Sequence, residues 1–279
     1  MKRSPLLITG AAILSALILA AVLAPFLAPY DPHALVGDSL GSPSGRHLLG
    51  TNNIGQDILS QLIWGARETL AVVVAAASLS VAGAVLAGVV PALIGGWTDI
   101  AAARLIDLLL AIPGLPLVLL VATLAGPSRP VLIFVIAFAG LPGIARILRS
   151  ETKTLRTRGF VGVAQGFGGG RGYVVRRHLI PGLTPVIVTR FVEWAGIAVF
   201  LQAGLAFLGL ADPTQPSWGL MLNRAIEHPG LYFSSVWTWW VLPAGFAVTL
   251  AVLGFTLVGV GLETTLNPRV ASHGESAAH

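Results

Sequence analysis

Long apolar segments, separated by short polar ones, repeat along most of this 279-residue chain. A helix of about 20 apolar residues crosses the roughly 30 Å hydrocarbon core of a bilayer, and each apolar segment reaches about that length. The pattern therefore predicts an all-α integral membrane protein with six transmembrane helices. The expected spans are Leu6–Ala28, Thr69–Ile94, Ile100–Gly126, Pro130–Leu148, Thr184–Leu210 and Trp237–Leu262.

The first apolar segment follows Lys2 and Arg3, as the apolar part of a secretory signal peptide would. Its apolar stretch is longer than the usual length of about 7–15 residues. No clear Ala-x-Ala cleavage site follows it. We therefore expect an uncleaved membrane anchor.

The composition agrees with insertion into a membrane. Charged residues make up 10% of the chain, whereas a soluble domain carries about 25%. The mean hydropathy is +0.83, so the chain lacks the polar residues that would cover a soluble surface. The sequence has no cysteine, which excludes disulfides and thiolate metal sites.

The positions of Lys and Arg predict the orientation in the membrane. With the N-terminus inside, only Arg46, Arg67, Arg129 and Arg224 of the 17 basic residues lie outside, which leaves 13 inside. Cytoplasmic loops carry such an excess of Lys and Arg, so both termini are expected in the cytoplasm. The basic balance is thereby assigned to membrane topology and lipid, and not to nucleic acid.

Three outer segments have recognisable patterns. Asp57–Trp64 is amphipathic and predicts a short helix on the outer membrane face. Trp237, Trp239 and Trp240 predict an aromatic belt at the outer interface. The outer loop Ala211–Val236 is interpreted either as a contact for a binding protein or as a plug.

Prolines inside the expected spans predict kinks, because proline removes a helical hydrogen bond. The residues concerned are Pro91, Pro113 and Pro116. Gating helices and static bundles both contain such kinks, so the prolines do not separate the two.

Ionisable residues within membrane spans often mark ion pathways. Here Asp107 follows Arg104 by three residues, and Glu193 follows Arg190 by three. We expect two local ion pairs at this helical spacing. Without an acid near the middle of the membrane, proton-coupled secondary transport lacks its usual signature.

A basic, glycine-rich cytoplasmic stretch, GVAQGFGGGRGYVVRRHLIPGL, begins at Gly162. It predicts one short amphipathic helix ending near Gly168 and a second one that Pro181 ends or bends. Two short helices joined by a glycine hinge are typical of a docking element. The alternative is a solvated loop whose only role is its positive charge.

The chemistry of nucleotide binding is missing from the sequence. No Gly-x-x-x-x-Gly-Lys-Ser/Thr motif occurs, and neither Lys2 nor Lys153 follows a glycine. The chain is therefore not expected to hydrolyse ATP. The histidines have no metal-ligand spacing, so we expect no cofactor in this chain.

The basic stretch resembles the cytoplasmic EAA loop of ABC-importer permeases. Ala164, Gly168 and Pro181 match that signature, whereas Gly162 replaces its Glu and Val163 its first Ala. The resemblance assigns an ATPase-coupling loop over about residues 150–183. Its proposed contacts are Ala164, Gly168, Gly169, Arg171, His178, Leu179, Ile180 and Pro181.

The segment HLLGTNNIGQDILSQLIWGARETL, from His47 to Leu70, resembles the one before the second span of peptide- and nickel-importer permeases. Asn52, Gln56 and Gln61 depart from that pattern. LAPYDP, FLGL, PSWG and NPR also resemble the C-type subunit of that family.

The resemblance implies a type I ABC-importer transmembrane domain with six helices. It implies residues 1–67 as an anchor and extracytoplasmic segment, 68–265 as the transmembrane domain and 266–279 as a cytoplasmic tail. The location implied is the inner membrane of a bacterium.

The partners implied are a B-type permease, ABC ATPase subunits that use ATP and Mg²⁺, and an extracytoplasmic substrate-binding protein. The implied cargo is a short peptide, moved by alternating access. Nickel or a metal chelate is the alternative cargo, and a stand-alone secondary transporter is the alternative from another class.

Overall fold

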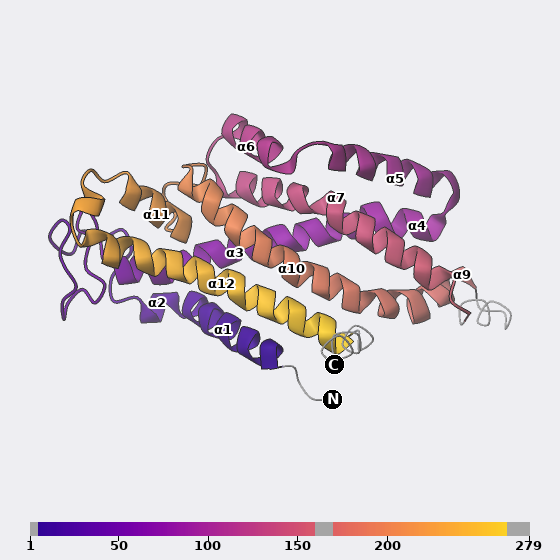
Figure 1. The fold of residues 1–279 in the computed structure, drawn as a ribbon, viewed down its shortest axis with the longest axis horizontal. Helices are drawn as coiled ribbons and strands as arrows, with labels where there is room; N and C mark the ends of the chain where they lie inside the picture. The colour runs from indigo at the N-terminus through magenta and orange to yellow at the C-terminus, as the bar shows by residue number, and fades with distance from the viewer. Residues whose placement is uncertain (1–4, 160–169, 267–279) are drawn as a thin grey trace, which may run out of the picture.

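The computed structural model describes residues 5–159 and 170–266 as an elongated bundle of helices (Figure 1). Within these residues all regular structure is helical, apart from two isolated bridges between residues 35 and 57. The helices are α1 (Pro5–Val22), α2 (Ala24–Leu27), α3 (Ile58–Ala84), η1 (Val85–Val89), α4 (Val90–Ile94), α5 (Gly96–Ala111), α6 (Gly114–Ala125), α7 (Arg129–Arg156), α9 (Arg171–Val174), η2 (Val175–Leu179), α10 (Ile180–Phe207), α11 (Trp218–Ile226), η3 (Leu231–Phe233) and α12 (Val236–Leu266).

The predicted all-α membrane fold is confirmed. In the described part of the chain, five helices are long and apolar enough to cross a membrane. The pair α5 and α6 makes a sixth span if its two bent helices count as one. Because Ile112 and Pro113 both have extended backbone angles, as the residue before a proline prefers, the pair bends by 82°.

The second span begins further out than predicted. One helical stretch of 37 residues runs from Ile58 to Ile94, and the carboxylate of Asp57 caps its start by accepting from the Ser60 N–H. The separate amphipathic helix predicted for Asp57–Trp64 is therefore wrong. Ile58 is completely buried, so the first turn of α3 packs into the fold.

Two π-turns stand directly before prolines. The Val90 N–H donates to the Val85 carbonyl ahead of Pro91, and the Ile180 N–H donates to the Val175 carbonyl ahead of Pro181. A proline supplies no N–H to the preceding turn, and the wider turn changes the hydrogen-bond register there. The helix continues from Gly172 to Phe207, so of the two predicted alternatives Pro181 does not end the helix.

Helix α10 lies between α7 and α12, and α1 lies along α12 (Figure 1). Small residues bring α1 and α12 close together. A Cβ added to Gly10 would lie 2.7 Å from the Leu257 Cβ, and one added to Gly254 would lie 2.9 Å from Leu14 Cδ2. Such close backbone approach is typical of helix pairs in membranes.

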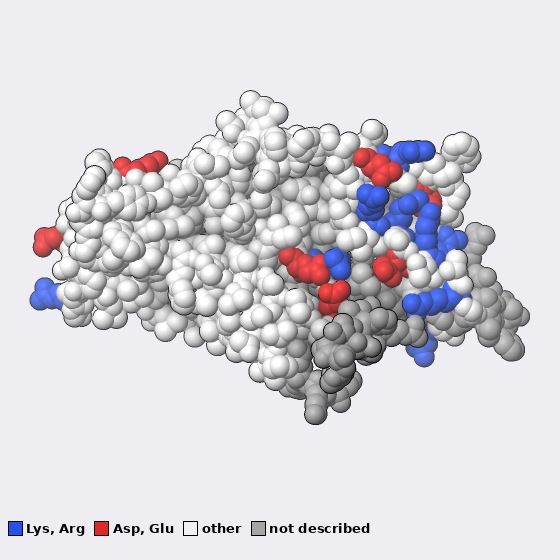
Figure 2. Space-filling model, in the orientation of Figure 1, with Lys and Arg blue, Asp and Glu red and all other residues white. Residues whose placement is uncertain are grey.

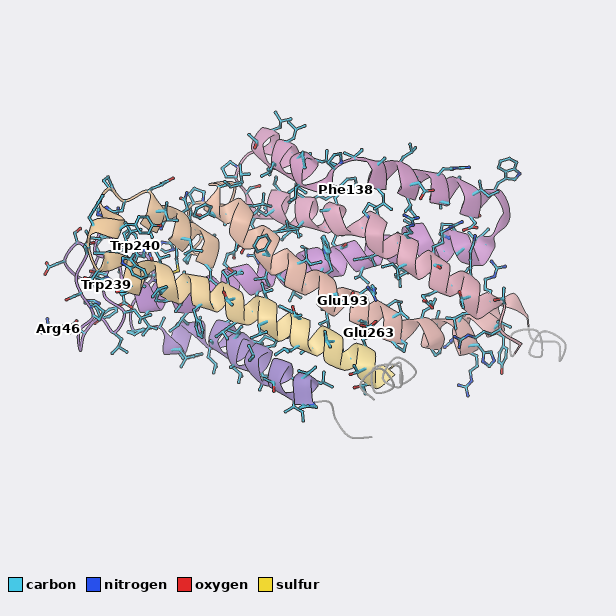
Figure 3. All side chains as sticks on the ribbon, in the orientation of Figure 1. Arg46, Phe138, Glu193, Trp239, Trp240 and Glu263 are labelled. Atoms are coloured by element: carbon cyan, nitrogen blue, oxygen red, sulfur yellow. The ribbon has the colours of Figure 1, made fainter. Side chains whose placement is uncertain are left out.

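The predicted aromatic belt is only partly correct. Trp237 is 37% exposed, whereas Trp240 is fully buried and its ring centre lies 6.0 Å from that of His228. Trp239 is partly buried within the main apolar core, close to Trp240 at the outer end of α12 (Figure 3). Two of the three rings therefore pack the bundle, because they lie on the face of α12 that meets the other outer segments.

Candidate functional site

Lys and Arg side chains gather at one end of the molecule, around the C-terminal part of α7 and the start of the α9–α10 helix (Figure 2). Arg146, Arg158, Arg176 and Arg177 are exposed there, and within the described residues no acid lies within ion-pairing distance of them. This end therefore presents cations to solvent or to a partner.

Three other cations on α7 hold the fold together. The Arg149 Nε and the Lys153 Nζ each lie 2.6 Å from the Asp99 carboxylate, and the Arg156 guanidinium donates to the Ala92 carbonyl. Positions four and then three residues apart share one face of a helix. These cations thus fasten the turn between α4 and α5 to α7.

The predicted coupling contacts divide into two groups. Ala164, Gly168 and Gly169 lie outside the described residues. Arg171 opens α9, and His178, Leu179, Ile180 and Pro181 continue the same helix into α10.

Along that helix, the face that packs against the bundle differs from the face that is exposed. Leu179 is 3% exposed and packs with Val174 against the apolar residues of α7, whereas Ile180 is 52% exposed. The rings of His178 and Tyr173 meet edge to face at 5.9 Å. Burial assigns Leu179 to internal packing, and the exposed side remains available for a partner.

The two predicted ion pairs have different outcomes. Arg190 Nη1 lies 2.5 Å from the Glu193 carboxylate, which confirms that pair. Arg104 and Asp107 are both exposed, and the ion pairs in the described part of the chain do not include either of them. Glu263 on α12 lies near Glu193 (Figure 3), and both line a groove between α10 and α12.

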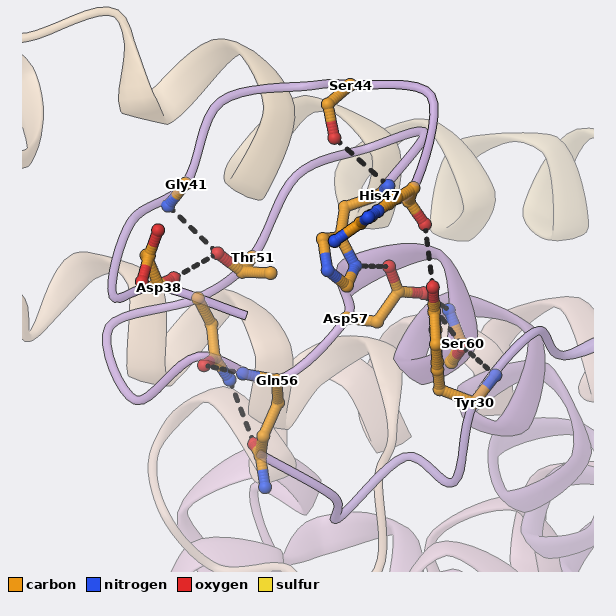
Figure 4. Close-up of polar contacts among 11 residues, drawn as sticks. Tyr30, Asp38, Gly41, Ser44, His47, Thr51, Gln56, Asp57 and Ser60 are labelled. Atoms are coloured by element: carbon orange, nitrogen blue, oxygen red, sulfur yellow. Dashed lines mark hydrogen bonds and ion pairs between the residues drawn. The ribbon is translucent and has the colours of Figure 1, made fainter. Parts of the chain in front are cut away.

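At the opposite end, the segment between α2 and α3 folds into a polar cap (Figure 4). The Asp57 carboxylate accepts from the Ser60 N–H at 2.8 Å and the Ser60 hydroxyl at 2.7 Å, and lies 2.9 Å from His47 Nδ1. The Thr51 hydroxyl donates to the Asp38 carbonyl. The motif residues Thr51, Asp57 and Ser60 therefore stabilise the fold of the cap.

Two further motif segments meet in space. The fully buried Trp218 of the PSWG motif packs on Gly65 of α3, where an added Cβ would lie 3.0 Å from Trp218 Cδ1. Ser217 caps α11 by accepting from the Leu220 N–H. The outer loop is therefore packed into the bundle through α11.

Helix α11 also carries a half-buried cation, Arg224. The Arg224 guanidinium donates to the Pro213 carbonyl at 2.7 Å. Burial lowers the pKa of Arg224 from its ordinary value, but an arginine remains protonated at physiological pH. Arg224 therefore holds the loop before α11 as a cation.

The sequence matches two family models. A model described as "binding-protein-dependent transport system inner membrane component" matches residues 80–272. One described as "N-terminal TM domain of oligopeptide transport permease C" matches residues 1–43.

Curated relatives match nearly the whole chain. The chain is 34% identical to the dipeptide transport system permease protein DppC of Alkalihalophilus pseudofirmus, over 98% of this chain and 88% of that protein. It is 34% identical to a putative peptide permease protein of Brucella suis, over 94% and 86%. It is also 34% identical to the glutathione transport system permease protein GsiD of Shigella flexneri, over 96% and 88%.

The helical spans, the matching family model over most of the chain and the full-length relatives agree. Together these findings exclude the alternative of a stand-alone secondary transporter. The chain belongs to the family of inner-membrane components of binding-protein-dependent transport systems: it is a multi-pass permease subunit of an ABC importer, it is not the ATPase, and it works with an ATPase and a substrate-binding protein.

Proposed function

We propose that this chain is the C-type permease of an ATP-driven importer that moves short peptides into the cell. The observation that carries this proposal is the set of relatives named for dipeptide, peptide and glutathione transport, each matching more than nine-tenths of the chain. The second permease is of the B type, and ATP and Mg²⁺ are bound by the ATPase subunits.

The orientation follows from the two differently charged ends. The cation-rich end, with Arg146, Arg158, Arg176 and Arg177, faces the cytoplasm, as Lys and Arg do in membrane proteins. The cap between α2 and α3 then lies outside, where the substrate-binding protein delivers its cargo. Both termini lie in the cytoplasm.

The segment of about residues 150–183 couples this permease to an ATPase. In the described part of that segment, the helix from Arg171 continues without interruption into α10, which crosses the membrane. A rigid helix of this kind carries movement from its cytoplasmic end to the cavity between the permeases. Closure of the ATPases on ATP therefore changes which side the cavity faces.

The cargo is tested with the purified transporter and its loaded binding protein. We expect di- to oligopeptides to stimulate ATP hydrolysis and to be taken up by reconstituted vesicles. Stimulation by nickel alone, with no response to peptides, would replace the peptide assignment with the metal one.

The coupling loop is tested with Ala164→Asp and Gly168→Val. Ala164→Asp places a charge in the proposed contact, where an unpaired buried charge costs several kcal/mol or more. Gly168→Val strains the proposed helix end by about 1–3 kcal/mol. Membrane insertion should survive both changes, while ATPase capture and peptide uptake fall.

Arg176→Gln serves as the matched control for the loop, because an exposed charge pair contributes about 0–1 kcal/mol. It should leave ATPase capture nearly unchanged. Normal ATPase capture and normal uptake by both Ala164→Asp and Gly168→Val would contradict the coupling assignment.

A further inference from the structure

A partly open polar cavity of about 540 Å³ lies beside the N-terminal part of α3. It is bounded by α3, by the start of α7 and by the loop before α11, and its lining includes Trp64, Arg67, Glu68, Arg129 and Gln215. Its volume is within the range of about 300–1,000 Å³ that is usual for small-molecule sites. The start of α7, which contributes Arg129 to the lining, lies well short of the N-terminal end of α12 (Figure 1).

One face of α3 forms the wall of this cavity. Trp64, Arg67, Glu68 and Ala71 all line it, and their spacing of three, four and seven residues places them on one side of a helix. The other side of the same turns is fixed, since the Trp218 N–H donates to the Thr69 hydroxyl at 3.4 Å. The wall is therefore held in place by the buried face of its own helix.

The charges on the wall are only partly paired. The Glu68 carboxylate lies 3.4 Å from Arg129 Nε, whereas in the described residues no acid lies within ion-pairing distance of Arg67. The Arg67 guanidinium instead lies over the Trp64 ring, 5.4 Å from its centre. The cavity lining thus holds one carboxylate and two guanidinium groups, and the nearby Asp212 also acts electrostatically on Glu68.

Arg67 has no structural role comparable with that of its neighbours in the motif. Asp57 and Ser60 cap α3, and Gly65 admits the Trp218 ring. Arg67 is exposed and lines the cavity, and among the described residues its guanidinium lies over an aromatic ring without an ion pair to any acid. A guanidinium of this kind is suited to a carboxylate, which it binds through two parallel hydrogen bonds.

We infer that this cavity is a recognition site for short zwitterionic peptides on their way into the transporter. Arg67 receives the side-chain carboxylate of an acidic peptide and Glu68 receives the terminal ammonium, so that acidic peptides are favoured over basic ones. The inference rests on the proposed peptide import and adds the residues that distinguish one peptide from another.

The test uses the complete transporter, reconstituted with its own ATPases, second permease and binding protein. The uptake of Ala-Glu is compared with that of Ala-Lys for each permease variant. Because the binding protein is the same throughout, any change in the Ala-Glu to Ala-Lys ratio comes from the permease. Basal ATP hydrolysis and recovery of the assembled complex verify that each variant folds.

Arg67→Gln should lower the Ala-Glu to Ala-Lys ratio about tenfold, the effect of losing one charge-assisted hydrogen-bonding group. Arg67→Glu should lower it further and favour Ala-Lys. Arg46→Gln, which removes a cation of the cap (Figure 3) that is outside the cavity lining, should leave the ratio unchanged.

Glu68→Gln is tested with a second pair of probes, Ala-Ala and N-acetyl-Ala-Ala. Wild type should favour the free amino group, and Glu68→Gln should reduce that preference several-fold. Glu227→Gln, at the C-terminal end of α11 and outside the cavity lining, is the matched control.

The outcomes distinguish the proposed recognition site from the proposed peptide cargo. Robust uptake with unchanged ratios in Arg67→Gln, Arg67→Glu and Glu68→Gln overturns the recognition site alone. An equal loss for every peptide also overturns it, because the residues would then serve docking or folding. A wild-type transporter that takes up no peptide overturns both the proposed cargo and this inference.

Discussion

The indole N–H of Trp218 donates to the backbone carbonyl of Leu62 at 3.0 Å, and thereby joins the outer loop to the second span. Trp218 is 1% exposed, whereas Trp97 is 85% exposed. We expect Trp218→Ala to destabilise the permease by about 3–5 kcal/mol, the usual cost of removing a large buried ring. The measurement is the thermal unfolding midpoint in detergent, and Trp97→Ala should leave that midpoint almost unchanged.

A second prediction concerns the contact between Gly88 of η1 and α7. An added Cβ at Gly88 would collide with the Ala145 backbone carbonyl, whereas one added to Gly143 of α7 would meet nothing within 4 Å. Gly88→Ala should therefore lower the unfolding midpoint. Gly143→Ala should be neutral or raise stability by about 0.5–1 kcal/mol, because alanine favours a helix. Equal effects of the two changes would contradict this packing.

The carboxylate of Asp99 should matter more than that of Asp107 on the same helix. Asp99 contacts both Arg149 and Lys153, and Asp107 is exposed. We expect Asp99→Asn to cost about 1–3 kcal/mol, as lost charge-assisted hydrogen bonds do. Asp107→Asn should change stability by less than about 0.5 kcal/mol. A protease-protection assay of the turn between α4 and α5 would detect the loosened contact.

The proposed topology is checked by labelling cysteines with a reagent that does not cross membranes. The sequence contains no native cysteine, so single substitutions give an unambiguous signal. Ser42→Cys should label from outside intact cells, and Ser272→Cys should label only after permeabilisation. Labelling of Ser272→Cys in intact cells would reverse the orientation on which the coupling proposal depends.

The apolar segments alone predicted the five long spans and the bent pair of α5 and α6, because burial in lipid requires long uncharged helices whatever their neighbours are. They did not predict the outer extension of α3, since Gln61 and Glu68 are polar and only the folded cap covers that end. Pro113 indicated a kink, but the 82° bend depends on both Ile112 and Pro113 being extended.

The motif comparison likewise identified residues without identifying their contacts. The three positions that depart from the family pattern, Asn52, Gln56 and Gln61, are close in sequence and touch in the cap. Asn52 Nδ2 donates to Gln56 Oε1 at 2.9 Å, and Gln61 Nε2 donates to the same oxygen at 2.6 Å. The family pattern that this segment resembles has an Asp and two Arg at these positions, whereas this chain has three neutral amides.

The last prediction follows from this neutral set. All three side chains are nearly completely buried, at 1%, 6% and 2% exposure for Asn52, Gln56 and Gln61. Asn52→Asp should therefore lower stability by about 3 kcal/mol or more, because it buries a charge with no cation beside it. Gln56→Arg or Gln61→Arg alone should also destabilise the cap, because each change buries an unpaired positive charge.

Combining Asn52→Asp with Gln56→Arg should recover part of the stability that each change removes alone. Asn52→Asp together with Gln56→Arg pairs the new charges, so the double variant should be more stable than the sum of the single effects predicts, by about 1–3 kcal/mol in a double-mutant cycle. Asp38→Asn, an exposed change in the same cap, should show no such coupling to Gln56→Arg. Strict additivity between positions 52 and 56 would mean that the three amides do not act as one network.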